Sequence, residues 1–476
     1  MKLNTAQVDR AVGTLLANAA GDALGAPYEF EPARGPELEV AMVGGGTFGW
    51  KPGEWTDDTS MAIAIAEVAA TGADLRDESA LTAIVTRWHG WAQTATDVGN
   101  QTRAVLSATG RAGLSGRNAL IASREFFETR GHSAGNGSLM RTSPVALAYL
   151  DDEDALAEAA ATISALTHYD PDAQEACVLW CLAIRHAVLT GEFDVRIGLD
   201  RLTDDRRALW ADRLDVAERS TPSDFRNNGW VVEALQAAWC AIATTPVPDD
   251  DPEAGVFAAD HLRLALDAAV RSGNDTDTVA AIAGALLGAK WGASAVPGTW
   301  RRVLHGWPGL HTRQLVQIAT RIIKADNEFP RAQKPLRLFH HPYDDGVLLG
   351  NAQALLKLPP GVDAIVSLCR VHDDDLPEGV EQIDVRLVDR TGPDENQHLE
   401  FVLTDTVRLV EQLRGEGRTV LVHCHGAYSR TPTIGALYGA RYLPTDGLAA
   451  MNAVVDALPE AAPNGVFWDA IERLGP

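Results

Sequence analysis

The chain has 476 residues and a formal net charge of −24. At about 100–200 residues per domain, this length favours two or three domains with substantial cores. The negative charge argues against a duplex nucleic-acid partner, which requires clustered Lys and Arg. Five scattered cysteines fit a reducing compartment better than a disulfide framework. Because no signal-peptide pattern or long apolar stretch is found, we expect a cytoplasmic protein without a membrane span.

Helical spacing of apolar residues dominates the first two thirds of the chain. It is clearest in residues 7–22, 60–70, 155–166 and 278–290. Many positions in these ranges are Ala or Gly, which favours close approach of neighbouring helix axes. The sequence therefore predicts an all-α domain over residues 1–325.

The pattern changes after this region. Residues 326–335 contain two prolines and are predicted to form a linker. Short β-rich runs then alternate with helical stretches; the runs are 362–368, 383–388 and 419–423, and the helical stretches are 399–413 and 431–442. This alternation predicts a separate α/β domain over residues 336–476.

Two acidic clusters each precede a predicted helix: Trp55-Thr56-Asp57-Asp58-Thr59 and Asn274-Asp275-Thr276-Asp277-Thr278. Crowded carboxylates repel one another, so holding them ionised together generally requires a bound cation. Their oxygen donors favour Mg²⁺, Mn²⁺ or Ca²⁺ over Zn²⁺. Taken singly, each cluster is more simply explained as a helix N-cap. Taken with the motifs described next, the two clusters predict one metal site.

Five motifs occur in the order and approximate spacing of the ADP-ribosylglycohydrolase family: residues 21–30, 55–59, 135–141, 166–168 and 273–278. Over roughly residues 5–325 the chain therefore resembles this family. The resemblance implies an all-α domain with two Mg²⁺ or Mn²⁺ ions at the base of a cleft. It also implies hydrolysis of the bond from the distal ribose of ADP-ribose to a protein side chain or small acceptor.

The resemblance implies roles for individual residues. The metal ligands would be Thr56, Asp57, Asp58, Asp275, Asp277 and Thr278. Glu29 matches an acidic residue that approaches the metals and the scissile bond, so it would be catalytic.

The substrate-binding residues implied by the resemblance are Asp97, Gly135, Asn136, Gly137, Ser138, Met140 and His168. Asp97 would lie near the acceptor group, where a carboxylate could face a guanidinium. Residues 135–138 would offer backbone N–H groups to the diphosphate. A structural role is open for each: Asp97 as a solvated loop aspartate, residues 135–138 as a tight turn, and His168 as a buried histidine with satisfied hydrogen bonds.

A second signature spans residues 420–431, where a β-rich run, a Cys-to-Arg loop and a helix start follow one another. This is the HC-x5-R-[ST] pattern, and residues 336–476 resemble the dual-specificity branch of the cysteine phosphatases. Cys424 would be the nucleophile of a phosphocysteine mechanism, Arg430 would bind phosphate and Thr431 would assist the departing thiolate. The phosphate-binding loop would comprise His425, Gly426, Ala427, Tyr428 and Ser429.

Two points remain open for this second site. Asp389 is the best match for the general acid, with Asp394 as a rival in the same loop. Ala427 replaces the glycine that the family usually has, and alanine would be strained if the position needs a positive φ. We therefore expect a two-domain hydrolase acting on ADP-ribosylated and phosphorylated substrates. Its alternatives are a non-catalytic C-terminal phosphate- or ADP-ribose-binding module, or an ADP-ribose recognition protein throughout.

Overall fold

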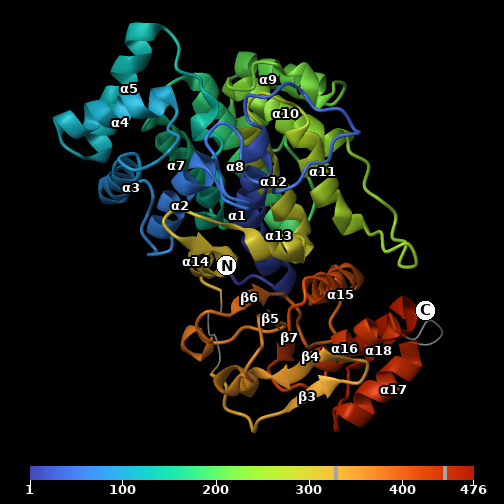
Figure 1. Cartoon of the computed structure of the whole chain (residues 1–476). Coiled ribbons are helices and arrows are strands. Elements are labelled where there is room, and N and C mark those ends of the chain that lie inside the picture. Colours follow the sequence, from blue (N-terminus) through green and yellow to red (C-terminus); the bar gives the residue numbers. More distant parts are fainter. Residues whose placement is uncertain (326–330, 443–446, 476) are drawn as a thin grey trace. The chain divides into compact units, whose positions relative to one another are not determined.

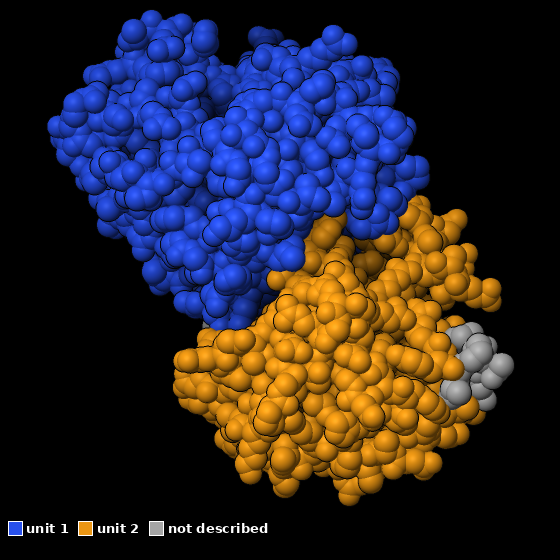
Figure 2. Space-filling view, in the orientation of Figure 1, with its two compact units in different colours: residues 1–246, 261–296, 303–325 blue, residues 247–260, 297–302, 326–476 orange. Residues whose placement is uncertain are grey.

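The computed structural model describes residues 1–325, 331–442 and 447–475. The chain divides into two compact units, which Figure 2 shows in different colours. Unit 1 comprises residues 1–246, 261–296 and 303–325, and unit 2 comprises residues 247–260, 297–302 and 326–476. Two short segments that precede the predicted boundary at residue 325 thus belong to unit 2. Residues 326–330 of the predicted linker lie outside the described residues.

Unit 1 is built from helices (Figure 1). Their bounds are α1 Thr5–Gly25, α2 Asp57–Ala69, α3 Glu78–Trp91, α4 Asn100–Ala112, α5 Gly116–Arg130, α6 Ser143–Ala148, α7 Glu153–Ala165, α8 Pro171–Thr190, α9 Asp204–Ala217, α10 Val231–Thr244, α11 His261–Val270, α12 Thr276–Trp291 and α14 Thr312–Ile322. The four ranges predicted as helices coincide with α1, α2, α7 and α12 to within a few residues. The all-α prediction is wrong in one detail, because β1 (His305–Gly306) and β2 (Leu310–His311) form a small antiparallel hairpin.

Helices α1 and α12 approach each other unusually closely, and Figure 1 shows them side by side within unit 1. A Cβ atom added to Gly284 on α12 would lie 2.1 Å from the carbonyl oxygen of Ala17. A Cβ atom added to Gly21 on α1 would lie 2.1 Å from the carbonyl oxygen of Ala280. The glycines therefore allow backbone-to-backbone packing. The Thr276 hydroxyl donates to the carbonyl oxygen of Gly25 at 2.9 Å, so the end of α1 meets the start of α12.

We expect Gly284→Ala to lower the free energy of unfolding by about 3 kcal/mol, because the new methyl group must push two helix backbones apart. Gly90 on α3 is the matched control, since a Cβ atom there would meet nothing within 4 Å. Gly90→Ala should raise the free energy of unfolding by about 0.5–1 kcal/mol through helix propensity alone. Urea titration followed by circular dichroism measures both changes. Equal effects of the two substitutions would contradict the close packing.

Unit 2 contains a five-stranded sheet with the order β3-β4-β7-β5-β6. Its strands are β3 Leu338–His341, β4 Asp344–Asn351, β5 Ala364–Ser367, β6 Glu381–Asp384 and β7 Val420–Cys424. Strand β3 is antiparallel to β4, and the other neighbours are parallel. The helices of the C-terminal part are α15 Leu399–Gly415, α16 Arg430–Ala440, α17 Gly447–Ala457 and α18 Gly465–Leu474, while α13 (Gly298–Val303) belongs to unit 2 up to residue 302.

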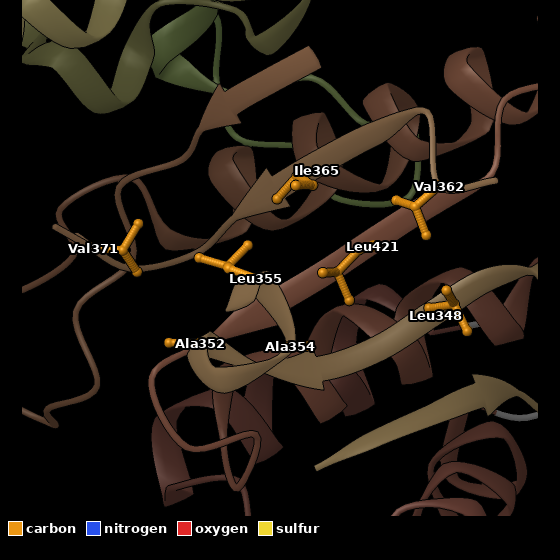
Figure 3. Close-up of a cluster of buried hydrophobic side chains, with 8 residues drawn as sticks. All are labelled: Leu348, Ala352, Ala354, Leu355, Val362, Ile365, Val371 and Leu421. Atoms are coloured by element: carbon orange, nitrogen blue, oxygen red, sulfur yellow. The ribbon is translucent and has the colours of Figure 1, made fainter. Parts of the chain in front are cut away.

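Part of the core of unit 2 lies against the parallel strands. Leu348 of β4, Ile365 of β5 and Leu421 of β7 belong to one buried apolar cluster, which Figure 3 shows. The predicted mixture of strands and helices is thus found, although β3 and β4 were not predicted and residues 385–388 of one predicted run lie beyond β6. Because β7 lies between β4 and β5, its C-terminal residue Cys424 emerges from the middle of the sheet.

Across the described ranges, none of the helices is both long enough and apolar enough for a bilayer crossing.

Candidate active sites

Three helix ends in unit 1 bring carboxylates together. Asp22 lies in the last turn of α1, and Asp58 and Asp277 lie in the first turns of α2 and α12. One oxygen from each of these three groups lies within 4.8 Å of the others. Glu29, Asp275 and Asp277 meet the same criterion, so Asp277 belongs to both groups. The close packing of α1 on α12 places these residues, which are distant in sequence, at one point.

This cluster is buried and short of hydrogen-bond donors. Asp58 is 0% exposed and Asp277 is 2% exposed. Among the described residues, Asp58 Oδ1, Asp277 Oδ1 and Glu29 Oε2 are buried oxygens without a hydrogen-bond partner. Burial raises the pKa of Asp58 and of Asp277 well above the ordinary value, and the neighbouring carboxylates raise both further. Such a cluster is unfavourable when ionised unless cations neutralise it.

Burial first, then the charges of Asp275 and Asp97, raise the pKa of Glu29 to about 9 in the absence of cations. Burial likewise raises the pKa of Asp22 to about 6. These carboxyl groups have pKa values of about 4 in the unfolded chain. At pH values between about 4 and the raised pKa values of the folded state, the folded protein holds protons that the unfolded chain has released. Folding stability of the metal-free protein therefore decreases as the pH rises through this window.

In EDTA, we expect Tm to fall steadily between about pH 5 and pH 9, and Mg²⁺ to reduce this slope because the cation replaces the protons as the counter-charge. Differential scanning calorimetry over this pH range measures the effect. A Tm in EDTA that rises with pH would contradict the folded-state protonation.

Asp22 is a member of the cluster that the sequence did not single out. Its two carboxylate oxygens accept hydrogen bonds from the backbone N–H groups of Thr56 at 2.8 Å and Thr59 at 2.9 Å. It therefore holds the first turn of α2, which carries Asp58. The sequence signal for Asp22 is its place in the motif of residues 21–30. Helical spacing alone assigns Asp22 to the buried side of α1.

The other predicted metal ligands lie around the same point. The Thr56 hydroxyl donates to Asp58 Oδ2 at 3.1 Å and lies 3.4 Å from Asp277 Oδ2. Thr278 is buried, and its hydroxyl lies 3.9 Å from the Met140 sulfur. Asp57 is partly exposed beside Thr56. The structure thus brings the set together, while its function as a ligand set stays a prediction.

This donor set fits hard divalent cations. It offers carboxylate and hydroxyl oxygens, and His and Cys are absent from both three-residue groups. Oxygen-only sites of this kind suit Mg²⁺, Mn²⁺ or Ca²⁺. The unpaired, buried carboxylate oxygens are what a cation would satisfy.

A cavity of about 160 Å³ adjoins the cluster through Thr56 and Asp57. Acidic and indole side chains dominate its walls: Trp50, Glu54, Trp55, Asp57, Trp91, Asp97 and Trp307. Trp307 lies in the loop between β1 and β2. Its carbonyl oxygen accepts a hydrogen bond from Trp55 Nε1 at 3.2 Å, which ties this loop to the cavity wall. Of these residues, the sequence indicated only Asp57 and Asp97. The four indoles come from three segments that are distant in sequence, with Trp50 and Trp55 in the same one, so no local pattern pointed to the set.

Asn136 contacts the cluster directly. Its side-chain amide donates to Asp275 Oδ2 at 2.7 Å and to the Asn228 carbonyl at 2.9 Å. Its backbone N–H donates to the Gly229 carbonyl at 3.1 Å and is thus engaged within the protein. Asn228, which the sequence did not indicate, also accepts from the Asp275 backbone N–H at 3.1 Å.

Two of the remaining predicted substrate residues of unit 1, Gly135 and Gly137, pack against His168. A Cβ atom added to Gly135 or Gly137 would lie 3.3 Å from His168 Nε2, so this ring packs against the 135–138 turn. Burial keeps the pKa of His168 well below its usual value. Ser138 is 2% exposed and accepts a hydrogen bond from Ser164, which gives it a structural contact. Met140 is also buried.

In unit 2, the loop after β7 wraps around the Cys424 sulfur. The backbone N–H of Ala427 points at Cys424 Sγ at 3.3 Å. Ala427 has a φ of 57°, a left-handed conformation that favours glycine, and its side chain is fully buried. The position thus has the positive φ at which alanine is strained, and the chain adopts it at a cost of about 1–2 kcal/mol.

Arg430 and Asp389 lie together beside this loop. Arg430 Nη1 donates to the carbonyl oxygens of Leu368 at 2.9 Å and Leu387 at 3.1 Å. Asp389 Oδ2 lies 3.8 Å from Arg430 Nε, and Asp389 Oδ1 accepts from Asn464 Nδ2 at 3.1 Å. The structure thus places Asp389, one of the two candidate acids, beside Arg430, while its role as the acid stays a prediction.

The other residues of the predicted phosphate-binding loop, and Thr431 after it, make contacts with side chains and backbone outside the loop. The Thr431 hydroxyl donates to the Gly350 carbonyl at 3.2 Å, so in this structure it is engaged away from the sulfur. Ser429 Oγ accepts from the Asn464 backbone N–H at 3.3 Å. Tyr428 is exposed and lies beneath the Lys334 ammonium, 5.3 Å from the ring centroid. Burial, together with Lys334 and Arg430, lowers the pKa of His425, and Gly426 is close enough to Lys334 that an added Cβ would lie 3.2 Å from its nitrogen.

Comparison with known proteins assigns the larger part of the chain to a protein family. The ADP-ribosylglycohydrolase family model matches residues 3–330. The chain therefore belongs to the ADP-ribosylglycohydrolase family of enzymes.

Two curated relatives illustrate the relationship. The chain is 30% identical over 298 residues to ADP-ribosylarginine hydrolase Tri1 of Pseudomonas putida (strain GB-1), covering 62% of this chain and 73% of that protein. It is 29% identical over 302 residues to the ADP-ribosyl-(dinitrogen reductase) glycohydrolase of Rhodospirillum rubrum, covering 61% and 89%. A solved ADP-ribosylglycohydrolase-related protein complex matches with a TM-score of 0.51 and 29% identity, over 68% of this chain and 99% of that one.

The C-terminal region is weakly similar to dual-specificity phosphatases over a small part of the chain. The crystal structure of human DUSP28 matches with a TM-score of 0.26 and 24% identity, covering 30% of this chain and 96% of that one.

Proposed function

We propose that unit 1 is a divalent-metal-dependent hydrolase that releases ADP-ribose from the guanidinium group of an arginine side chain. The observation that supports this most is the cavity beside the carboxylate cluster, because Thr56 and Asp57, two of the predicted metal ligands, line it. The names of the relatives point the same way, since one is an ADP-ribosylarginine hydrolase.

The cavity has the size and chemistry for a guanidinium group. Its volume of about 160 Å³ is similar to that of cavities that hold one benzene-sized group. Asp57 and Asp97 supply carboxylates that can accept the guanidinium N–H groups. The indoles of Trp50, Trp91 and Trp307 supply faces on which a planar cation stacks. A serine acceptor would use neither feature.

The residues that would hold the cations are Asp58, Asp275 and Asp277 with Thr56, Asp57 and Thr278, while Asp22 fixes the start of α2. When bound, Mg²⁺ or Mn²⁺ would position the ribose hydroxyl groups and acidify a water molecule. Glu29, at the edge of the cluster with Asp275 and Asp277, would accept a proton from the attacking water as positive charge develops on the ribose ring. Asp97 would hold the departing guanidinium.

Peptides that carry ADP-ribose on arginine or on serine, incubated with the protein and Mg²⁺ and then analysed by mass spectrometry, test this proposal. We expect loss of the arginine-linked group only, and a lower rate for Asp97→Asn. Release from serine but not from arginine would overturn the arginine assignment. Retention of both modifications would overturn the hydrolase assignment.

For unit 2, a specific geometry favours a second function, that of a cysteine-dependent phosphatase in a separate domain spanning residues 336–476. The Ala427 N–H group that points at Cys424 supports a cradle for a tetrahedral anion, which Arg430 at the other end of the loop would complete. In this scheme the Cys424 sulfur attacks phosphorus, the bond to the leaving oxygen breaks, and Asp389 gives that oxygen a proton. Water then cleaves the phosphocysteine, which releases phosphate and restores the thiolate. The alternative is a binding module that holds phosphate without turnover.

A further inference from the structure

The segment between Glu29 and Thr56 is a long surface loop that forms one wall of the unit 1 cavity. Loops of this length without helices or long strands are uncommon in compact domains and usually carry function. Tyr28 anchors its first half, because the Tyr28 hydroxyl both donates to and accepts from the Ala41 backbone at 2.9 Å. Trp50 and Glu54, at its other end, line the cavity.

Phe30 occupies an unfavourable position in this loop. Its φ is 66°, which is rare for a bulky residue and costs about 1–2 kcal/mol. Its backbone N–H donates to the Asn274 carbonyl at 2.6 Å, and the Asn274 N–H donates to the Glu31 carbonyl at 2.7 Å. These bonds hold the strained backbone, yet the Phe30 side chain is 61% exposed. The fold thus maintains strain without gaining burial of the aromatic ring.

Phe30 begins a row of aromatic rings that ends in the cavity. The centroids of Phe30 and Phe48 are 6.1 Å apart, and those of Phe48 and Trp50 are 6.0 Å apart. Trp50 is itself a wall of the cavity. Leu38 and Val43, in the same loop, are 45% and 61% exposed. The aromatic row therefore runs from the candidate acceptor site to the exposed ring of Phe30.

We propose that Phe30, Phe48 and Trp50 form a docking surface for the polypeptide segment that carries the ADP-ribosylated arginine. This inference rests on the proposed function of unit 1 and narrows its substrate to proteins in which an apolar side chain flanks the modified residue. Alternate side chains of an extended chain lie about 6.6–7 Å apart, close to the 6.0 and 6.1 Å steps of the aromatic row. With the arginine in the cavity beside Trp50, the side chain two residues away lies over Phe48 and the side chain four residues away lies over Phe30.

Phe30→Asn tests the surface, because asparagine tolerates a positive φ and removes the ring. The two substrates are a peptide with leucine four residues from ADP-ribosylarginine, and free ADP-ribosylarginine. We expect kcat/KM for the peptide to fall about tenfold relative to that for free ADP-ribosylarginine, through KM rather than kcat. The control is Ile121→Asn on α5, because Ile121 is another exposed apolar residue of unit 1, with 47% exposure. This substitution should leave kcat/KM unchanged for both substrates.

A second peptide, with serine in place of leucine, completes a double-mutant cycle between Phe30 and the leucine of the peptide. Phe30→Asn should alter kcat/KM for this serine peptide by less than about twofold. An equal fall for the peptide and for free ADP-ribosylarginine, or no fall at all, would overturn the docking surface and leave the hydrolase assignment intact. If the parent protein hydrolyses neither substrate, the proposed function fails, and the docking surface fails with it.

Discussion

Asp277→Asn is expected to reduce Mg²⁺-dependent ADP-ribose release by about a thousandfold or more. Asp277 belongs to both three-residue carboxylate groups, so its loss weakens every arrangement of cations in the cluster. Several kcal/mol of charge stabilisation depend on bound cations in reactions of this class, and each 1.4 kcal/mol is a factor of about ten in rate. Release of ADP-ribose from arginine-modified protein, measured against Mg²⁺ concentration, gives the effect.

The same substitution should have the opposite effect on the stability of the metal-free protein. Asp277 is 2% exposed among other carboxylates, so an amide at this position avoids both the cost of burying a charge and the cost of protonating the carboxyl group. In EDTA we expect a higher Tm than that of the parent, and Mg²⁺ should raise the Tm of the variant much less. Asp212→Asn, at an exposed position on α9, is the matched control and should leave both properties unchanged. A variant that is destabilised in EDTA yet releases ADP-ribose normally would contradict the cation cluster.

Cys424→Ser is expected to abolish turnover of an aryl phosphate while preserving the binding of phosphate or vanadate. A serine hydroxyl is not ionised near neutral pH, so the nucleophile is lost. The loop N–H groups and Arg430 remain, because the substitution changes one atom at the centre of the cradle. Release of p-nitrophenol measures turnover, and isothermal titration with vanadate measures binding. Cys369→Ser, in the same unit, is the matched control and should retain turnover.

Two further variants refine this result. Asp389→Asn should slow phenyl phosphate hydrolysis far more than p-nitrophenyl phosphate hydrolysis, because only the poorer leaving group needs a proton. Asp394→Asn should show no such difference. Absence of turnover by the parent protein on both esters, together with retained anion binding, would establish the binding module instead of the phosphatase.

Local patterns in the sequence predict much of this fold. Apolar residues at helical spacing and the Thr-Asp starts of α2 and α12 are local features, and the four ranges predicted as helices in unit 1 lie where they were expected. The β3–β4 pair was missed because residues 338–351 contain polar and glycine positions that weaken a strand pattern.

The composition of the site was less predictable. Asp22 was missed because its role depends on two N–H groups more than thirty positions away in α2. The tryptophan-lined cavity was missed because tertiary packing, and not spacing, brings Trp50, Trp91 and Trp307 together. Thr431 was expected near the sulfur but donates to Gly350 in the neighbouring strand β4, a contact that depends on sheet order.

Carboxylates at the starts of α2 and α12 are proposed to hold a pair of divalent cations, and the hydrolase activity of unit 1 is proposed to depend on that pair. Anomalous diffraction from crystals soaked in Mn²⁺ tests it most directly. We expect two anomalous peaks among the side chains of Asp58, Asp275 and Asp277, and no peak at these positions in Asp277→Asn crystals. Mn²⁺ peaks elsewhere in unit 1, with none in this cluster, would contradict it.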